Sequence, residues 1–202
     1  MNMINLDNFF LPKSIFLGQD ISSPWSITAN AEEIIHAFLS TLDQQYIINN
    51  GIAVHREATI EANAIIKPPV IIGPRCFVAS FTYLRGGVYL ESDVILGPSV
   101  EVKSSFIFRE SKAAHFNFIG DSIIGDDVNI EAGAILANYR NELPKKEIVC
   151  YYQQQHIHTQ TNKFGSLIGS NSKIGANAVL APGTIIDSQS VVQRLELVDQ
   201  LQ

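Results

Sequence analysis

Five polar residues in the middle of this 202-residue chain have side chains with complementary chemistry. They are Arg85, Glu101, Lys103, His115 and Asn138. The imidazole of His115 can accept a proton near neutral pH, and a carboxylate such as Glu101 can fix its tautomer. Arg85 and Lys103 can bind a phosphomonoester, and Asn138 can donate a hydrogen bond to an oxyanion. The set indicates proton transfer beside a bound phosphate group.

The composition limits the classes of protein to which the chain can belong. The formal net charge is −6, 46% of the residues are hydrophobic and 17% are charged. This apolar content is enough for a buried core, so wholesale disorder is excluded. The longest basic run is Lys145-Lys146, and therefore no nucleic-acid interface is expected.

The sequence also bears on the compartment in which the protein works. No stretch approaches the roughly 20 apolar residues that span a bilayer, so no membrane span is expected. Residues 1–20 lack a basic region followed by an apolar run and are not expected to be a signal peptide. Only two cysteines are present, Cys76 and Cys150, which fits a reducing compartment. We therefore expect a cytoplasmic protein.

A six-residue repeat must position the polar residues. From Val54 onward Val, Ile, Leu or Phe returns at every sixth position, with a shift of four residues between Phe108 and Phe118 and a long interruption before Ile168. A small residue usually stands two positions earlier, and Cys76 is one of these, so it is expected to pack inside. A period of six fits a short strand followed by a turn, not a helix. It is typical of hexapeptide β-helices and predicts about six coils.

The two ends of the chain lack this repeat. Residues 1–53 are predicted to form a helical and loop segment, with a helix over 29–42 that Asn30 caps and Trp25 packs against. The β-helix is predicted over 54–192, with a loop or hairpin inserted at 141–165. Residues 193–202 are predicted to form a C-terminal helix, because apolar residues recur there at helical spacing.

The sequence around His115 is more specific than the repeat. It includes Glu101-Val102-Lys103, KAAHFNFIGD at 112–121 and DVNIEAGAILANY at 127–139. These segments resemble the acetyltransferase domain of the bifunctional UDP-N-acetylglucosamine pyrophosphorylase/glucosamine-1-phosphate N-acetyltransferase family, with its VEMK-, KAGHLTYLGD- and VNIGAGTITCNYDG-like segments. The resemblance covers about residues 79–190 and implies that the β-helix is left-handed. The chain offers no Gly-rich phosphate loop for a pyrophosphorylase, so a separate uridylyltransferase is expected as a partner.

The resemblance implies a role for each matching residue. His115 falls on the catalytic base, Glu101 on a carboxylate near it, and Asn138 beside the acetyl group. Substrate-binding positions of the family fall on Arg85, Lys103, Phe118, Asn129, Tyr139 and Lys145. Coenzyme A contacts fall on Ala132, Tyr139 and Ala176.

Two positions depart from the family pattern. Phe118 stands where the family has a tyrosine, and the missing hydroxyl removes about 1–3 kcal/mol of phosphate binding if its partner stays buried. The loop lysine of the family has no direct match, because Lys145 or Lys146 fits by count and Lys163 fits by the residues after it. The pair His156 and His158 lacks further ligands, so no metal is expected.

The resemblance implies an enzyme, an N-acetyltransferase that uses acetyl-coenzyme A. The acceptor would be glucosamine-1-phosphate or a related amino-sugar phosphate, in UDP-N-acetylglucosamine synthesis, and the site would be shared between the chains of a homotrimer. One alternative is a weak or inactive homologue that binds a sugar nucleotide or acts as a partner subunit, which Phe118 favours and His115 opposes. The other alternative is a UDP-amino-sugar acyltransferase, which would need a pocket for a long acyl chain.

Overall fold

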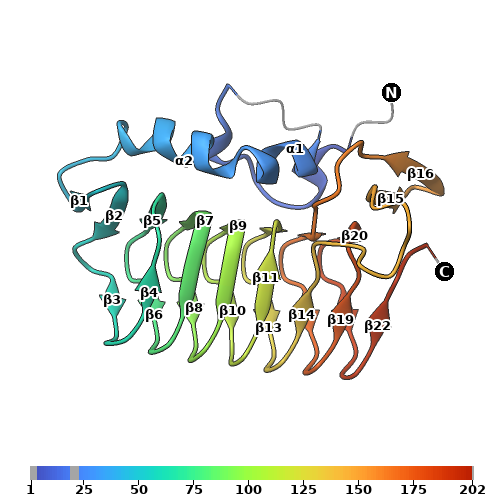
Figure 1. The fold of residues 1–202 in the computed structure, drawn as a ribbon. Helices are drawn as coiled ribbons and strands as arrows, with labels where there is room; N and C mark the ends of the chain where they lie inside the picture. The colour runs from blue at the N-terminus through green and yellow to red at the C-terminus, as the bar shows by residue number, and fades with distance from the viewer. Residues whose placement is uncertain (1–3, 19–22, 202) are drawn as a thin grey trace.

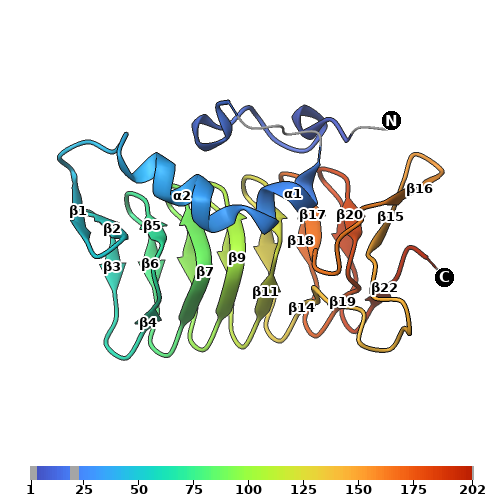
Figure 2. The same ribbon diagram turned by 45° about the horizontal axis from the view of Figure 1, so that its top comes forward.

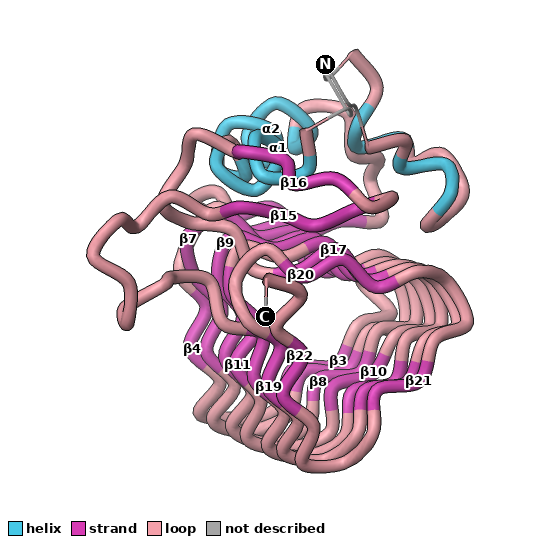
Figure 3. Tube along the Cα trace, turned by 90° about the vertical axis from the view of Figure 1, so that its right-hand side faces the viewer, coloured by secondary structure: helices cyan, strands magenta, loops and turns pink. Residues whose placement is uncertain are grey.

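Short strands separated by tight turns wind into a parallel β-helix with three flat faces (Figures 1 and 3). The computed structural model describes residues 4–18 and 23–201. The predicted segments 1–53 and 193–202 therefore include a few residues outside the described part, namely 1–3, 19–22 and 202. Val54 pairs with Ile72 and Ile72 with Leu90, so each coil takes three six-residue repeats. The predicted hexapeptide β-helix is confirmed.

Within residues 4–18 and 23–201, two of the three faces have no further layer of secondary structure packed on them (Figure 3). One of these two faces, here called the third face, is a seven-stranded sheet. It consists of β3 (Thr59–Ile60), β6 (Phe77–Val78), β8 (Ile95–Leu96), β10 (Lys112–Ala113), β13 (Asn129–Ile130), β18 (Lys173–Ile174) and β21 (Val191–Val192). The other of the two, here called the outer face, consists of β4 (Ile65–Ile66), the first halves of β7 (Tyr83–Leu90) and β9 (Glu101–Ile107), β11 (Phe118–Gly120), β14 (Ile135–Leu136), β19 (Val179–Leu180) and β22 (Leu197–Val198). Seven strands in one face mean seven coils, one more than predicted.

The remaining face, here called the covered face, carries a second layer of the protein. It consists of β2 (Ile52–His55), β5 (Val70–Ile72), the second halves of β7 and β9, β12 (Ile123–Ile124), β17 (Ser166–Ile168) and β20 (Thr184–Ile186). Strand β1 (Tyr46–Asn49) pairs antiparallel with β2 and closes the first coil. β7 and β9 turn the corner between two faces, with a register shift between Arg85 and Val88.

Alternate residues of the strands fill the interior of the β-helix, where Leu84, Leu96 and Leu136 are fully buried. The predicted inward series is wrong at Phe108 and Phe118. Ile107 and Ile119 point inward instead, because the coil between Glu101 and Phe118 is one residue shorter than the coil before it. Phe108 packs outside the β-helix, and Phe118 is half-buried on the outer face.

The N-terminal segment lies across the covered face (Figures 1 and 2). It contains η1 (Leu6–Asn8), η2 (Ser14–Phe16), α1 (Pro24–Ala29) and α2 (Ala31–Leu39). Its buried side chains, such as Phe9, Phe16 and Ile35, form a second hydrophobic core with Phe106 and Phe108 of the β-helix. This layer also buries Ile148 and Cys150 of the inserted segment.

The predicted helix over 29–42 is α2, which is shorter than predicted at Ala31–Leu39, and the separate short helix α1 precedes it and meets it at Asn30. The Asn30 side chain donates to the carbonyl of Ser26 instead of capping α2, so the predicted cap is wrong. Asn30 therefore ends α1, and its conformation lets α2 start in a new direction. The first residues of α2 pack on Gly87, where a Cβ atom would lie 2.7 Å from the Glu32 nitrogen. Glycine at this position permits the helix to approach the β7 backbone.

The interruption at 141–165 contains the predicted hairpin, formed by β15 (Val149–Tyr152) and β16 (Gln155–His158). The predicted C-terminal helix is wrong, because β22 pairs in parallel with β19. The six-residue spacing from Val192 to Val198 continues the repeat, and the preceding coil supplies the hydrogen-bond partners for one more strand. Backbone pairing with a neighbouring coil outweighs a short amphipathic pattern, because isolated helices of this length are marginal.

Candidate active site

A cavity of about 550 Å³ opens at the edge of the outer face, beside the inserted segment. It is lined by Arg85, Lys103, Phe118, Asn138, Tyr139, Asn162 and Lys163. Five of these are predicted site residues, and the volume suits a small ligand. Three cationic side chains around one hollow favour an anionic ligand, such as a phosphate ester.

The β-helix sets Arg85 and Lys103 side by side. They are register partners in β7 and β9, and both point outward because Leu84 and Val102 before them point into the core. The Arg85 Nε and Nη2 atoms donate to Glu101 Oε1 at 2.9 and 2.6 Å. Both side chains of this pair are about one-third exposed, and such pairs are weak. A phosphate can therefore compete for the guanidinium.

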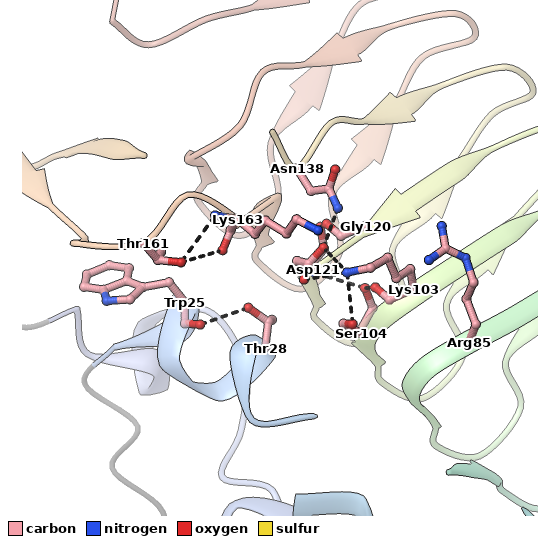
Figure 4. Close-up of polar contacts among 12 residues, drawn as sticks. Trp25, Thr28, Arg85, Lys103, Ser104, Gly120, Asp121, Asn138, Thr161 and Lys163 are labelled. Atoms are coloured by element: carbon pink, nitrogen blue, oxygen red, sulfur yellow. Dashed lines mark hydrogen bonds and ion pairs between the residues drawn. The ribbon is translucent and has the colours of Figure 1, made fainter. Parts of the chain in front are cut away.

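Asp121, in the turn after β11, forms an ion pair with the Lys103 ammonium group (Figure 4). The distances from Lys103 Nζ to Asp121 Oδ1 and Oδ2 are 3.0 and 2.8 Å. The carboxamide nitrogen of Asn138 donates to the same carboxylate. Asp121 is not among the predicted site residues, although it ends the segment 112–121.

Lys163, not Lys145, reaches this cavity. The Lys145 side chain is exposed and pairs with Glu147 at 2.7 Å, outside the cavity lining. In Figure 4 the Lys163 side chain extends toward Gly120 and Asp121. The structure therefore corrects the assignment of Lys145. The residues after the lysine were a better guide than its count along the chain, because the inserted segment does not follow the six-residue repeat.

Residues 161–165, here called the strap, carry Lys163 along the edge of the outer face. The Phe164 nitrogen donates to the Asn138 carbonyl at 3.2 Å, and the Gly165 nitrogen donates to the Asp121 carbonyl at 2.8 Å. Phe164 is fully buried and meets the ring of Trp25 edge-on, with ring centroids 6.1 Å apart. Trp25 belongs to α1, so the N-terminal segment supports one wall of the cavity. Trp25 was predicted to pack against the helix over 29–42, whereas its ring contact is with Phe164 of the strap.

The ring of Phe118 lies over Gly120 in the cavity wall. A Cβ atom at position 120 would lie 2.7 Å from this ring and 2.8 Å from the Asn138 carboxamide nitrogen. A side chain at position 120 would therefore have to displace the aromatic ring or the carboxamide. The ring gives this part of the cavity an apolar surface.

His115 lies on a different edge of the outer face from the cavity. It precedes β11, whereas Asp121 follows β11, and the side chain of His115 is exposed. Backbone hydrogen bonds stack this corner in successive coils: Gly133 donates to the His115 carbonyl, and Asn177 donates to the Ala132 carbonyl. His115, Ala132 and Ala176 therefore form a row, here called the corner row. The structure places three predicted residues together there, apart from the cavity.

The predicted contact between Glu101 and His115 is not made in the described part of the chain. Glu101 is bound by Arg85 of the preceding coil, and no hydrogen bond or ion pair joins it to His115. The reason is the register: the Glu101 nitrogen pairs with the Asn117 carbonyl, so His115 lies beyond the strand at the turn. A single chain thus separates the imidazole from the cluster of cations.

Asn129 lies on the third face, away from the cavity that holds the other predicted sugar contacts. It lines a separate groove of about 380 Å³ with Lys173 and Arg194. Arg194 donates to both oxygens of Glu131 at 2.7 Å, and the Ala176 nitrogen donates to Glu131 at 2.8 Å. These hydrogen bonds, chiefly that of Arg194, lower the pKa of Glu131 to about 2.

Two members of the corner row have small side chains at the protein surface. Ala132 and Ala176 present only methyl groups, and both are partly exposed. Arg194 follows in the same row of the next coil, where the Leu195 nitrogen donates to the Ala176 carbonyl.

Neither a metal site nor a membrane span is found in residues 4–18 and 23–201. No group of three potential ligands among His, Cys, Asp and Glu comes together in these ranges. His158 instead faces Glu147, with Nδ1 at 3.4 Å from the carboxylate, and His156 packs against Tyr151. No helix in the same ranges has the length and apolar character needed to cross a bilayer.

Two known families match parts of the chain. The family described as the GMPPB C-terminal domain matches residues 48–158, which is more than half of the sequence. The hexapeptide repeat of succinyl-transferase matches residues 167–193, in the last coils. The first match ends before the strap, and the second begins after it.

Several curated proteins are similar to most of the chain. A bifunctional sugar-1-phosphate nucleotidylyltransferase/acetyltransferase of Sulfurisphaera tokodaii is 31% identical over 172 residues, covering 83% of this chain and 42% of the relative. A bifunctional protein GlmU of Methanococcus vannielii is 31% identical over 185 residues, covering 90% and 44%. That of Heliobacterium modesticaldum is 34% identical over 140 residues, covering 64% and 28%. The chain spans less than half the length of these relatives.

Proposed function

Because the chain belongs to the GMPPB C-terminal domain family, we propose that it is an acyltransferase of sugar phosphates that moves acetyl from acetyl-coenzyme A to an amine. The acceptor we propose is glucosamine-1-phosphate or a close amino-sugar phosphate, in UDP-N-acetylglucosamine synthesis. The names of the relatives, which combine a sugar-1-phosphate with acetyl transfer, support this chemistry.

The observation that carries the proposal is the cavity with three cations. Arg85, Lys103 and Lys163 approach one hollow of about 550 Å³, and Asn138 and Tyr139 complete its wall. A phosphate can accept from the guanidinium and both ammonium groups, while the sugar lies against Phe118. Charge-assisted bonds of this kind are strong enough to select a phosphorylated sugar over a neutral one.

His115 is proposed to take the proton that the amine loses as it is acetylated. An N–C bond forms, the C–S bond of the thioester breaks, and the proton moves to an imidazole nitrogen. Because His115 and the cavity lie at opposite edges of the outer face, we propose that neighbouring copies of the chain complete one site. The cations of one copy would then face the imidazole of another.

Acetyl-coenzyme A would supply the activated acetyl group when bound. Ala132 and Ala176 would hold its extended portion along the corner row, and Tyr139 would approach it from the cavity. Asn138 commits one N–H bond to Asp121 and keeps a second for the developing oxyanion.

A homotrimer is the proposed assembly, and exposed apolar side chains support it. Ile65 and Leu197 of the outer face are 54% and 61% exposed, and Phe81, Phe116 and Leu195 at the corner are 65%, 68% and 79% exposed. These side chains are spread along the β-helix, and burying them against neighbouring copies would remove apolar surface from water. Phe116 adjoins His115, so association at this corner would bring the imidazole to a neighbouring copy. Light scattering of Phe116→Asp, followed by activity, tests this: full activity in a monomer excludes the shared site.

The decisive assay is release of the coenzyme A thiol with acetyl-coenzyme A and glucosamine-1-phosphate. We expect turnover in the wild type and its loss in His115→Ala, with the same mass and melting temperature. Phe118 favours one second candidate, a homologue that binds the sugar phosphate without turning it over. A wild-type trimer that binds glucosamine-1-phosphate but releases no thiol would support that candidate. Turnover only with a UDP-amino sugar and a long acyl donor would replace both.

A further inference from the structure

The carboxylate of Asp121 contacts two cavity residues that come from different coils. Lys103 belongs to β9 and donates to both oxygens, and Asn138 follows β14 and donates its carboxamide hydrogen. Only 6% of the Asp121 side chain is exposed, so these two partners occupy it almost completely. Figure 4 shows the two side chains converging on Asp121.

We propose that Asp121 is a positioning residue of the cavity: it holds the Lys103 ammonium and the Asn138 carboxamide in the orientation that binds an amino-sugar phosphate. This inference rests on the proposed function. Asp121 acts through its two partners and does not itself touch the reacting atoms.

The backbone around Asp121 is tied into the β-helix without the carboxylate. The Asp121 nitrogen donates to the Lys103 carbonyl, and its own carbonyl accepts from Gly165, both at 2.8 Å. These main-chain bonds already join β9, the turn after β11 and the strap. The side chain is therefore not needed to stack the coils, and its contacts serve the side chains that line the cavity.

Lys103 needs such a partner because an ammonium on a flexible stem loses rotamer freedom when it binds a ligand. A carboxylate that accepts hydrogen bonds with both oxygens orders the lysine side chain before the ligand arrives. This lowers the conformational entropy that is lost on binding. Within the described chain Lys163 makes no ion pair, so it is available to attract the phosphate. Arg85 and Lys103 are held in place by Glu101 and Asp121.

Asp121 also fixes which end of the Asn138 carboxamide points away from it. An ionised carboxylate only accepts hydrogen bonds, so Asn138 must turn its nitrogen toward Asp121. The Asn138 oxygen is then left without a partner in the described part of the chain and can accept a hydrogen bond from the amine of the ligand. Asparagine at position 121 would remove this constraint, because either end of one amide can face the other.

The test compares Asp121→Asn with Asp126→Asn. Asp126 is a matched control, since it also binds a lysine, Lys13, at similar burial, and it contacts no residue that lines the cavity. The substrates are glucosamine-1-phosphate and free glucosamine, with acetyl-coenzyme A in both series. We expect Asp121→Asn to raise KM for glucosamine-1-phosphate about tenfold or more, through loss of a charge-assisted contact. The KM for acetyl-coenzyme A should stay unchanged, and kcat/KM for free glucosamine should fall much less.

A merely structural role predicts a different pattern. Both variants would then have lower stability, and kcat/KM would fall equally for the two sugars. An unchanged KM for glucosamine-1-phosphate in folded Asp121→Asn would overturn the proposal. If this variant does not fold, Asp121→Ser, which removes the charge from a smaller side chain, is measured in the same way. If the wild type shows no turnover, the proposed function fails. Calorimetric binding of glucosamine-1-phosphate, without acetyl-coenzyme A, then decides the positioning role: equal affinity in wild type and variant refutes it.

Discussion

The ion pair of Arg140 and Asp199 allows a quantitative test of how the last coil supports the cavity. Arg140 directly follows the cavity residues Asn138 and Tyr139, and its side chain is only 6% exposed. Its two terminal nitrogens donate to the Asp199 oxygens at 2.7 and 2.8 Å, and one also donates to the Pro182 carbonyl at 3.2 Å. The hydrogen bond to Asp199 is the main reason that the pKa of Arg140 is raised.

Replacing Arg140 removes both of its charged hydrogen bonds from the buried Asp199 carboxylate. The Asp199 side chain is 7% exposed, so Arg140→Met should lower the free energy of unfolding by about 3–5 kcal/mol. For a chain of this size, about 1 kcal/mol corresponds to about 2–4 °C in melting temperature. Arg140→Met together with Asp199→Leu removes both charges, and this double variant should be close to the wild type.

Thermal and urea unfolding of the single and double variants, followed by circular dichroism, measures these differences. Stability in a solenoid is approximately a sum of neighbouring repeats, so hydrogen exchange over residues 184–201 should show that the last coil opens first. The reasoning is refuted if Arg140→Met lies within 1 kcal/mol of the wild type. It is also refuted if the double variant is as unstable as the sum of its single changes.

Three further results are expected. Lys163→Ala should raise KM for glucosamine-1-phosphate about tenfold or more, since it removes a charge-assisted contact of about 1.5–3 kcal/mol, whereas Lys145→Ala should stay within about twofold in the same kinetics. Phe118→Tyr should lower that KM by up to about tenfold if its hydroxyl reaches the phosphate, and an unchanged KM would show that the ring alone matters. Burial raises the pKa of Cys76 and Cys150 from 9.0 to about 12, so a thiol reagent should label them only after unfolding. Because the folded state keeps these protons above pH 9, the free energy of unfolding is unaffected by the thiols below about pH 9 and falls as the pH rises toward 12. The fall is about 1.4 kcal/mol per pH unit for each thiol. Urea unfolding at pH 8 and 10.5 measures this difference.

The β-helix could be predicted from the sequence because each coil repeats the same pattern of buried side chains and turns. An inward aliphatic residue every six positions buries itself, and pairing with the neighbouring coil satisfies the backbone. The same rule, applied to Val192 and Val198, would also have predicted the last strand correctly. The helical pattern over 193–202 was a weaker signal, since only one face of such a short helix could be buried.

The family was also accessible from the sequence, because polar residues at fixed register carry more information than the repeat. Arg85 and Lys103 are register partners, and the matched segments place Phe118 and Asn138 in the next coils. The GMPPB C-terminal domain match and the acetyltransferase relatives confirm the resemblance. The roles of the individual residues remain proposals.

What the sequence could not predict lies where the repeat is broken. The inserted segment has no period, so counting residues placed Lys145 at the cavity when the strap brings Lys163 there. The strap is held by Trp25, Asn138 and Asp121, and none of these contacts follows from local spacing. The β-helix thus supplies the rows of cations, whereas the cavity exists because two irregular segments close over one edge of it. Changes in the N-terminal segment, such as Trp25→Ala, should therefore affect sugar-phosphate binding although they lie outside the repeat.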